Sequence, residues 1–194
     1  VLESGTATLR ANTIASNHAG DDAGGIFLDY SDAILVGNTI ASNTAAQDGG
    51  GLDIWNCDPI LSGNRIASNE AGSGGGGAHM VNSSPVFTNT FIADNQAGTT
   101  GGGLHIDWSS PRLWHSTISN NSSGDGSGLG ILEASTVTST VALTNTILVS
   151  HTVGITISAG NTVVLEHTLW GSGTSANGID WAGDGDVQVG AVNI

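Results

Sequence analysis

Three polar residues at one position of a repeated pattern are the strongest candidates for chemistry in this sequence. Asp53, His79 and His105 follow one another at intervals of 26 residues, and Asp107 comes shortly after His105. Carboxylates and imidazoles act as general acids and bases, and histidine is the side chain that titrates closest to neutral pH. These four residues are therefore the candidate catalytic group.

Aromatic and charged residues accompany this group in the repeated pattern. Aromatic rings offer flat apolar faces on which sugar rings can stack, while carboxylate and guanidinium groups bind hydroxyl groups. The candidate binding residues are Asp29, Tyr30, Trp55, Trp108, Arg112 and Trp114. Together they predict a surface that binds a carbohydrate.

Two kinds of catalysis are compatible with these side chains. In a hydrolase, Asp29 and Asp53 would lie about 8 Å apart in adjacent repeats, a separation that suits an inverting acid–base pair. In a lyase, His79 or His105 would abstract a proton. A lyase acting on uronates must also neutralise the sugar carboxylate; Arg112 is the only nearby cation in the pattern, so a polyanionic substrate would need a bound metal.

The sequence predicts no metal ion and no cofactor. His79, His105 and Asp53 could bind a transition metal, but their spacing equals the repeat length and is not a ligand signature. Aspartates elsewhere could bind Ca²⁺, although no loop of the D-x-D-x-D type is present. The simplest alternative is that the polar column, and turn aspartates such as Asp48, are solvated at the surface of a repeat.

An internal repeat defines the elements that hold these residues. Short alternating apolar runs broken by Gly, Asn, Ser and Asp indicate strands and turns rather than helices. Coils of about 26 residues, stacked about 4.8 Å apart, would place equivalent side chains in columns, as in a parallel β-helix. The motif Ile-x-x-Asn marks this period five times, beginning at Ile14, Ile40, Ile66, Ile92 and Ile118.

The columns separate structural positions from functional ones. Inward Ile and Leu columns are expected to form the core, Asn columns to form amide ladders, and the Gly-Gly-Gly segments to form sharp corners with positive φ. Asp53, His79 and His105 alternate with the inward residues, so they are expected to point outward. Function is therefore expected on the outward positions of the strand that follows the glycines.

Charge excludes several classes of partner. The formal net charge is −14, and the only basic residues other than histidine are Arg10, Arg65 and Arg112. A nucleic-acid-binding protein needs a basic surface, and the same deficit disfavours anionic membranes. We therefore expect no nucleic-acid partner. Because no apolar run is long enough to span a bilayer, we also expect no membrane insertion.

One domain is predicted for residues 1–194, with regular repeats over 1–128 and less regular closing coils over 129–194. Neither end carries an obvious polar cap. Solenoids need such caps, so we expect that the solenoid continues in a longer protein or that its ends self-associate or are covered by a neighbour.

The combination of Ile-x-x-Asn with a Gly-Gly-apolar element, as in 40–43 with 50–52, resembles the repeats of the pectate-lyase-like superfamily. The segment SSPVFTNTFIADN (Ser83–Asn95) is especially similar to polymorphic outer-membrane-protein-type repeats, and VALTNTIL (Val141–Leu148) resembles the closing coils of large secreted bacterial surface proteins. The resemblance implies an all-β, single-stranded right-handed parallel β-helix of about seven to eight coils, located outside the cell or at its surface.

Three functions follow as hypotheses. The first is a secreted or cell-surface module, adhesin-like, that binds a polysaccharide, a cell-surface glycan or another surface. The second is a polysaccharide-active enzyme, either a glycoside hydrolase or a lyase, acting on the exposed strand face. The third is a structural stalk or fibre unit. Since one fold can host all three, the sequence leaves enzymatic activity open.

Overall fold

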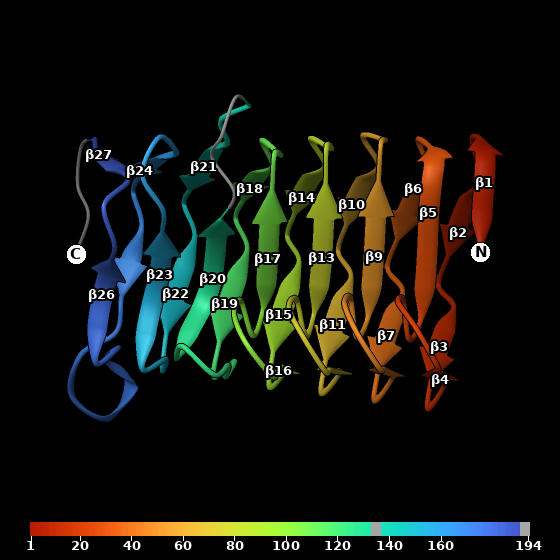
Figure 1. The fold of residues 1–194 in the computed structure, drawn as a ribbon, viewed down its shortest axis with the longest axis horizontal. Coiled ribbons are helices and arrows are strands. Elements are labelled where there is room, and N and C mark those ends of the chain that lie inside the picture. The colour runs from red at the N-terminus through yellow and green to blue at the C-terminus, as the bar shows by residue number, and fades with distance from the viewer. Residues whose placement is uncertain (133–136, 191–194) are drawn as a thin grey trace.

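The computed structural model describes residues 1–132 and 137–190. This part of the chain forms a parallel β-helix in which the strands of successive coils stack side by side along one long axis (Figure 1). All the strand pairings in the two long sheets are parallel, for example β9 with β13 and β10 with β14. The predicted all-β parallel solenoid is confirmed.

Two sheets contain eight strands each. Sheet A consists of β1(Leu2–Gly5), β5(Ile26–Ser31), β9(Leu52–Trp55), β13(Ala78–Val81), β17(Leu104–Asp107), β20(Ser127–Leu132), β23(Val153–Ile157) and β26(Ile179–Ala182). Sheet B consists of β2(Thr8–Arg10), β6(Ile34–Val36), β10(Ile60–Ser62), β14(Val86–Thr88), β18(Arg112–Trp114), β21(Thr140–Thr144), β24(Thr162–Glu166) and β27(Asp186–Val189).

Two shorter sheets complete each coil. Sheet C consists of β3(Thr13–Ala15), β7(Thr39–Ala41), β11(Arg65–Ala67), β15(Phe91–Ala93), β19(Thr117–Ser119), β22(Ile147–Val149) and β25(Leu169–Trp170). Sheet D consists of β4(His18–Ala19), β8(Thr44–Ala45), β12(Glu70–Ala71) and β16(Gln96–Ala97). Among the described residues the one helix is the 3₁₀ turn η1(Gly173–Ser175), and no helix is long and apolar enough to cross a membrane.

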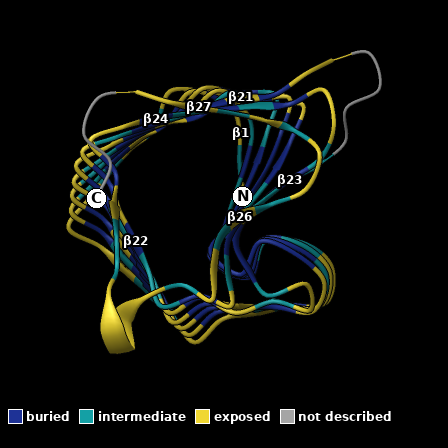
Figure 2. Cartoon of the chain, turned by 90° about the vertical axis from the view of Figure 1, so that its left-hand side faces the viewer, coloured by how far each residue is buried: buried dark blue, intermediate teal, exposed yellow. Residues whose placement is uncertain are grey.

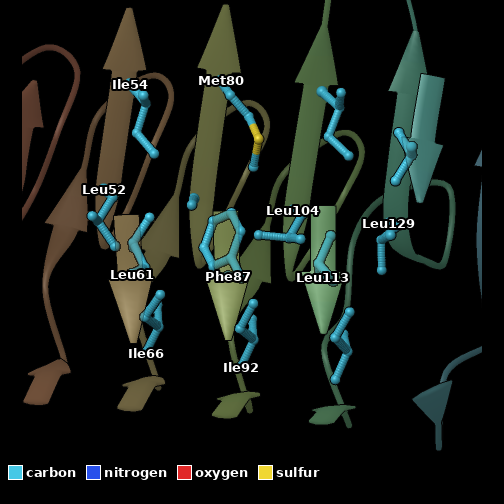
Figure 3. Packing of buried hydrophobic residues seen from close by; sticks show 14 of the residues in the cluster. Leu52, Ile54, Leu61, Ile66, Met80, Phe87, Ile92, Leu104, Leu113 and Leu129 are labelled. Carbon is cyan, nitrogen blue, oxygen red and sulfur yellow. The ribbon is translucent and has the colours of Figure 1, made fainter. Parts of the chain in front are cut away.

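The core is a stack of like side chains inside the coils. Ile40, Ile66 and Ile92 are in register in sheet C and are fully buried. Equivalent columns line sheets A and B, and in Figure 3 their side chains point into one shared interior. Each fully buried Leu, Ile or Phe side chain stabilises the fold by about 1.5–3 kcal/mol.

An asparagine ladder runs beside this core, as the Ile-x-x-Asn motif predicts. The side-chain amide of Asn43 donates to Asn69 over 3.0 Å, Asn69 to Asn95 over 3.0 Å, and Asn95 to Asn121 over 2.9 Å. The repeat lengthens between β20 and β21: Leu104 pairs with Leu129, 25 residues later, whereas Arg112 pairs with Ala142, 30 residues later.

In each of three successive coils, the segment that joins sheet D to sheet A turns back over the outer face of sheet A. We call these segments (residues 46–51, 72–77 and 98–103 in three successive coils) the glycine-rich corners; Figure 2 shows them as a largely buried loop outside the main section. Gly49 has φ +68°, and a Cβ on it would lie 2.7 Å from the Cβ of Asp53. Glycine is therefore required both by the backbone conformation and by the close approach to the sheet.

Candidate functional site

The predicted polar column is in register in sheet A. Asp53 on β9 pairs with His79 on β13, and His79 pairs with His105 on β17. The side chains are not solvated, however: Asp53 is 0% exposed and His79 is 5% exposed. The expectation that the outward positions of this strand lie open to solvent is wrong for this column.

The glycine-rich corners are the cause of this burial. A Cβ on Gly74 would overlap the Nδ1 atom of His105, so the corner of one coil covers the strand of the next coil. The same relation holds one coil later, where a Cβ on Gly130 would overlap the hydroxyl of Thr100. Residue sizes on the two surfaces are complementary, with Gly opposite His and Thr opposite Gly.

A chain of polar contacts runs through the buried column. The indole N–H of Trp55 donates to Oδ2 of Asp53 over 2.9 Å, and Oδ1 of Asp53 lies 2.9 Å from Nδ1 of His79. On the other side of the ring, Nε2 of His79 lies 3.4 Å from Oδ2 of Asp107. His79 is therefore held between two carboxyl groups.

The surroundings of His79 favour its charged form. Burial by itself would lower the pKa of His79, but the hydrogen bonds to Asp107 and Asp53 outweigh that effect and raise it to about 10. Burial would raise the pKa of Asp107, but the contacts from His105 and His79 hold it well below its usual range. At neutral pH these two groups form a buried ion pair.

His105 completes the cluster without a well-aligned hydrogen bond. Its Nε2 atom lies 3.3 Å from Oδ2 of Asp107. Within the described part of the chain, both ring nitrogens of His105 and Oδ1 of Asp107 are buried and have no hydrogen-bond partner. Buried polar atoms without partners are uncommon, so these atoms need an explanation.

Asp48 joins the cluster from the glycine-rich corner. One carboxylate oxygen of Asp48 and one ring nitrogen each of His79 and His105 lie within 4.8 Å of one another, so these residues could hold a metal ion. From the sequence we expected no metal ion here, and we expected Asp48 to be a solvated turn residue. The signal that could have placed it is the adjacent Gly-Gly-Gly segment, because glycines let a corner backbone pack closely against a sheet.

The cluster is closed to large substrates. Both carboxylate oxygens of Asp53 are engaged, by Trp55 and by His79, and the side chain has no exposed surface. Asp29, its proposed partner as an inverting acid–base pair, is only half-buried. A polysaccharide could reach Asp53 only if residues 46–51 moved away from sheet A.

Two of the predicted binding residues lie on a different feature, the corner that joins sheets A and B. Tyr30 is 64% exposed and Trp108 is 37% exposed. Asn56 and Asn82 hold the equivalent positions in the two coils between them, and the amide of Asn82 donates to that of Asn56 over 2.9 Å. We call these four residues the Tyr30–Trp108 corner.

A shallow depression of about 340 Å³ lies on this corner. Asp32 and Asp58 contribute exposed carboxylates to it, and the backbone N–H of Asp58 donates to Oδ1 of Asp32 over 2.7 Å. The lining residues are Tyr30, Asp32, Asn56, Cys57, Asp58 and Asn82. Asn56, Asn82, Asp32 and Asp58 are not among the binding residues that the sequence predicts.

The remaining predicted binding residues are divided between two places. Asp29 and Trp55 are register neighbours in sheet A, and Trp55 belongs to the buried cluster through its bond to Asp53. Arg112 and Trp114 lie on β18 of sheet B, where a depression of about 360 Å³ is lined by Ser84, Val86, Ser110, Arg112, Thr140 and Ala142. The six candidates therefore do not form one site.

The stacked parallel coils and their amide ladder define a class of protein, the parallel β-helix. A family model described as the right-handed beta helix region matches residues 1–169. The chain therefore belongs to the right-handed β-helix family, as its resemblance to the pectate-lyase-like superfamily implies. Among curated proteins and among solved structures, no match to the chain was found.

Proposed function

We propose that this chain is a carbohydrate-binding module, extracellular or at the cell surface, whose binding site is the Tyr30–Trp108 corner. The observation that carries the proposal is the backbone conformation of the two exposed aromatic residues. Tyr30 has φ +48° and Trp108 has φ +49°, in the left-handed region. Bulky residues rarely occupy that region, and doing so costs about 1–2 kcal/mol.

The two coils between Tyr30 and Trp108 show that the fold itself does not impose this cost. Asn56 and Asn82 take the same conformation, with φ +53° and +50°, and asparagine tolerates it well. The corner therefore does not require an aromatic residue for folding. Strained residues that folding does not require are found preferentially at functional sites, which supports a binding role for Tyr30 and Trp108.

The geometry of the corner suits an extended glycan. Three coil repeats separate Tyr30 from Trp108, which corresponds to about 14 Å at the spacing of parallel strands. A glycan lying along the helix axis would contact an aromatic ring at each end and the amides of Asn56 and Asn82 between them. Each amide has donor and acceptor positions beyond the bond that joins them.

The charge of the site selects among glycans. Asp32 and Asp58 are exposed at the depression, and the whole chain has a formal net charge of −14. A polyanionic glycan would be repelled by this field. We therefore expect a neutral polysaccharide as the ligand.

The test is a binding measurement with neutral plant and microbial polysaccharides, using variants that the repeat itself supplies. Tyr30→Asn and Trp108→Asn introduce the residue found at the equivalent positions, so the fold should be preserved. We expect each variant to lose about two- to tenfold in affinity from the stacking contact alone, because such a contact is worth about 0.5–1.5 kcal/mol beyond the area it buries.

The matched control is Trp114→Thr. Trp114 is 40% exposed on sheet B and pairs with Thr88 and Thr144, so threonine fits that position. Glycan binding should be unaffected by this change. Binding that is lost in Trp114→Thr and kept in Tyr30→Asn would place the site on sheet B and refute the proposal.

The parent chain and one more variant, Asp107→Asn, distinguish binding from the enzyme and stalk hypotheses. A polysaccharide-active enzyme would release new chain ends from one of the polysaccharides, and that activity would fall in Asp107→Asn. A stalk or fibre unit would form filaments at high concentration through its end coils, visible by electron microscopy. A binding module shows saturable binding with neither of these results.

A further inference from the structure

The buried cluster beneath the glycine-rich corner is separate from the Tyr30–Trp108 corner and has a chemistry of its own. It brings Asp48, His79 and His105 together from three coils, with one potential ligand atom of each within 4.8 Å of the others. We propose that these three residues bind a transition-metal dication of the Zn²⁺ class, which ties the corner to two strands of sheet A.

The ligand atoms are close to a metal-bound arrangement. Zn²⁺ binds imidazole nitrogen at about 2.0–2.1 Å and carboxylate oxygen at about 2.0–2.2 Å, so two ligands of one ion lie no more than about 4.3 Å apart. Because the ligand atoms lie within 4.8 Å of one another, the widest pair would close by at most about 0.5 Å to reach this limit, and by at most roughly 1.4 Å to reach the tetrahedral spacing of about 3.4 Å. Side-chain rotation can supply that movement, and Asp48 is only half-buried.

His105 provides independent support for a bound metal ion. Its Nδ1 atom is buried and forms neither a hydrogen bond nor an ion pair with any described residue, although buried polar atoms are nearly always paired. Nε2 lies 3.3 Å from Asp107, and Nδ1 lies against Gly74 of the corner. The backbone N–H of Gly74 donates to Oδ1 of Asp48 over 2.7 Å, so the unpartnered Nδ1 and the Asp48 carboxylate meet at the same residue.

The cluster also contains the outer groups that metal-binding histidines use. A ligating histidine commonly has a carboxylate on its other nitrogen, which orients the ring. His79 has Asp53 on one nitrogen and Asp107 on the other, at 2.9 and 3.4 Å. Asp53 is in turn held by the indole of Trp55. To bind the ion, His79 would release the proton from one ring nitrogen and give up the carboxylate contact of that nitrogen, while the carboxylate on the other nitrogen would orient the ring.

The composition of the ligand set selects the metal. Two imidazoles and one carboxylate suit Zn²⁺ and similar transition metals, whereas Ca²⁺ and Mg²⁺ require mainly oxygen ligands. Three carboxyl groups surround the two histidines, so the pocket carries the negative charge that a dication compensates. The ion would join residues 46–51, β13 and β17 across successive coils.

The test uses the whole chain, first treated with a chelator and then titrated with Zn²⁺ alone by calorimetry. We expect one ion per chain, and at least a tenfold loss of affinity in His105→Gln and in Asp48→Asn. Titration with Co²⁺ should produce visible absorption bands that both variants lack. The control is His18→Gln, because His18 is exposed on β4 and should leave the affinity unchanged.

Several results would overturn the inference. It fails if the parent chain binds no Zn²⁺ at millimolar concentration, or if His105→Gln and Asp48→Asn bind as tightly as the parent. Should His105→Gln not fold by circular dichroism, Asp48→Asn decides alone, because the amide can still accept the bond from Gly74. Glycan binding should persist in both variants, so this result is distinct from a failure at the Tyr30–Trp108 corner.

Discussion

The imidazole of His105 occupies the space that a side chain at Gly74 would fill. These residues belong to adjacent coils and to different surfaces, one to the glycine-rich corner and the other to the outer face of sheet A. Their contact shows how a strand position that alternates with the core becomes buried on its outer side. It also explains why the corner at this place must be glycine.

Adding a methyl group at Gly74 should therefore destabilise the fold. Gly74→Ala would force His105 out of its position, and overpacking of this kind costs about 1–3 kcal/mol. Urea unfolding measures the difference. Gly20→Ala is the control, since nothing lies within 4 Å of a Cβ there and surface changes are usually within about 0.5 kcal/mol. Equal stability of both variants would show that His105 moves aside without cost.

Removing the Asp53 carboxylate should be among the most destabilising changes in sheet A. Asp53→Leu would leave the indole N–H of Trp55 and the ring of His79 without their partner. Breaking a buried pair in this way costs about 3–5 kcal/mol. Asp29→Leu, one coil earlier on a half-buried position, should cost less than about 1 kcal/mol. Similar midpoints of denaturation for the two variants would show that the contacts of Asp53 with Trp55 and His79 do not stabilise sheet A.

The asparagine ladder predicts a contrast between an inner rung and an end rung. Asn69 is 1% exposed; its Oδ1 accepts two bonds from Asn43, and its amide donates to Ile40 and Asn95. Asn69→Ala should cost about 3 kcal/mol or more, because several buried groups lose partners worth about 1–3 kcal/mol each. Asn17→Ala, at the exposed end of the same ladder, removes one side-chain bond and should cost about 1 kcal/mol in thermal or urea unfolding.

A histidine in the ladder predicts a loss of stability in acid. The amide of Asn121 donates to Nε2 of His151, and Nδ1 of His151 faces Oδ1 of Asn177, so the neutral ring fits. Burial lowers the pKa of His151 to about 4, with the bond to Asn177 acting weakly in the opposite direction. The folded state therefore takes up its proton at lower pH than the unfolded chain, whose histidine has a pKa of about 6.5.

Acid should therefore destabilise the folded chain through His151. The contribution of His151 is complete above about pH 6.5 and falls as the pH is lowered towards 4, by about 3 kcal/mol in total. His151→Asn restores the residue type found elsewhere in the ladder and should remove this component. Urea unfolding at pH 7 and pH 4.5 tests it, and an unchanged pH dependence in His151→Asn would refute the assignment.

The period of the sequence was sufficient to predict the fold. Like side chains recur every 26 residues, and like stacks on like only if each coil lies directly on the next. Ile66 is therefore placed between Ile40 and Ile92 by the repeat alone, and the amide of Asn69 bonds to Asn95 for the same reason. The alignment of Asp53, His79 and His105 follows from the same period.

The environment of that column was decided by tertiary structure. Alternation along a strand distinguishes the inner face of a sheet from the outer face, but it does not show what covers the outer face. The glycine-rich corners carry glycine at most of the positions that lie against sheet A, so their backbone can pack directly on the sheet and bury Asp53 and His79. Asp48 joins the histidines through this contact between coils, and Tyr30 and Trp108 stay exposed because the corner between sheets A and B turns away from the core.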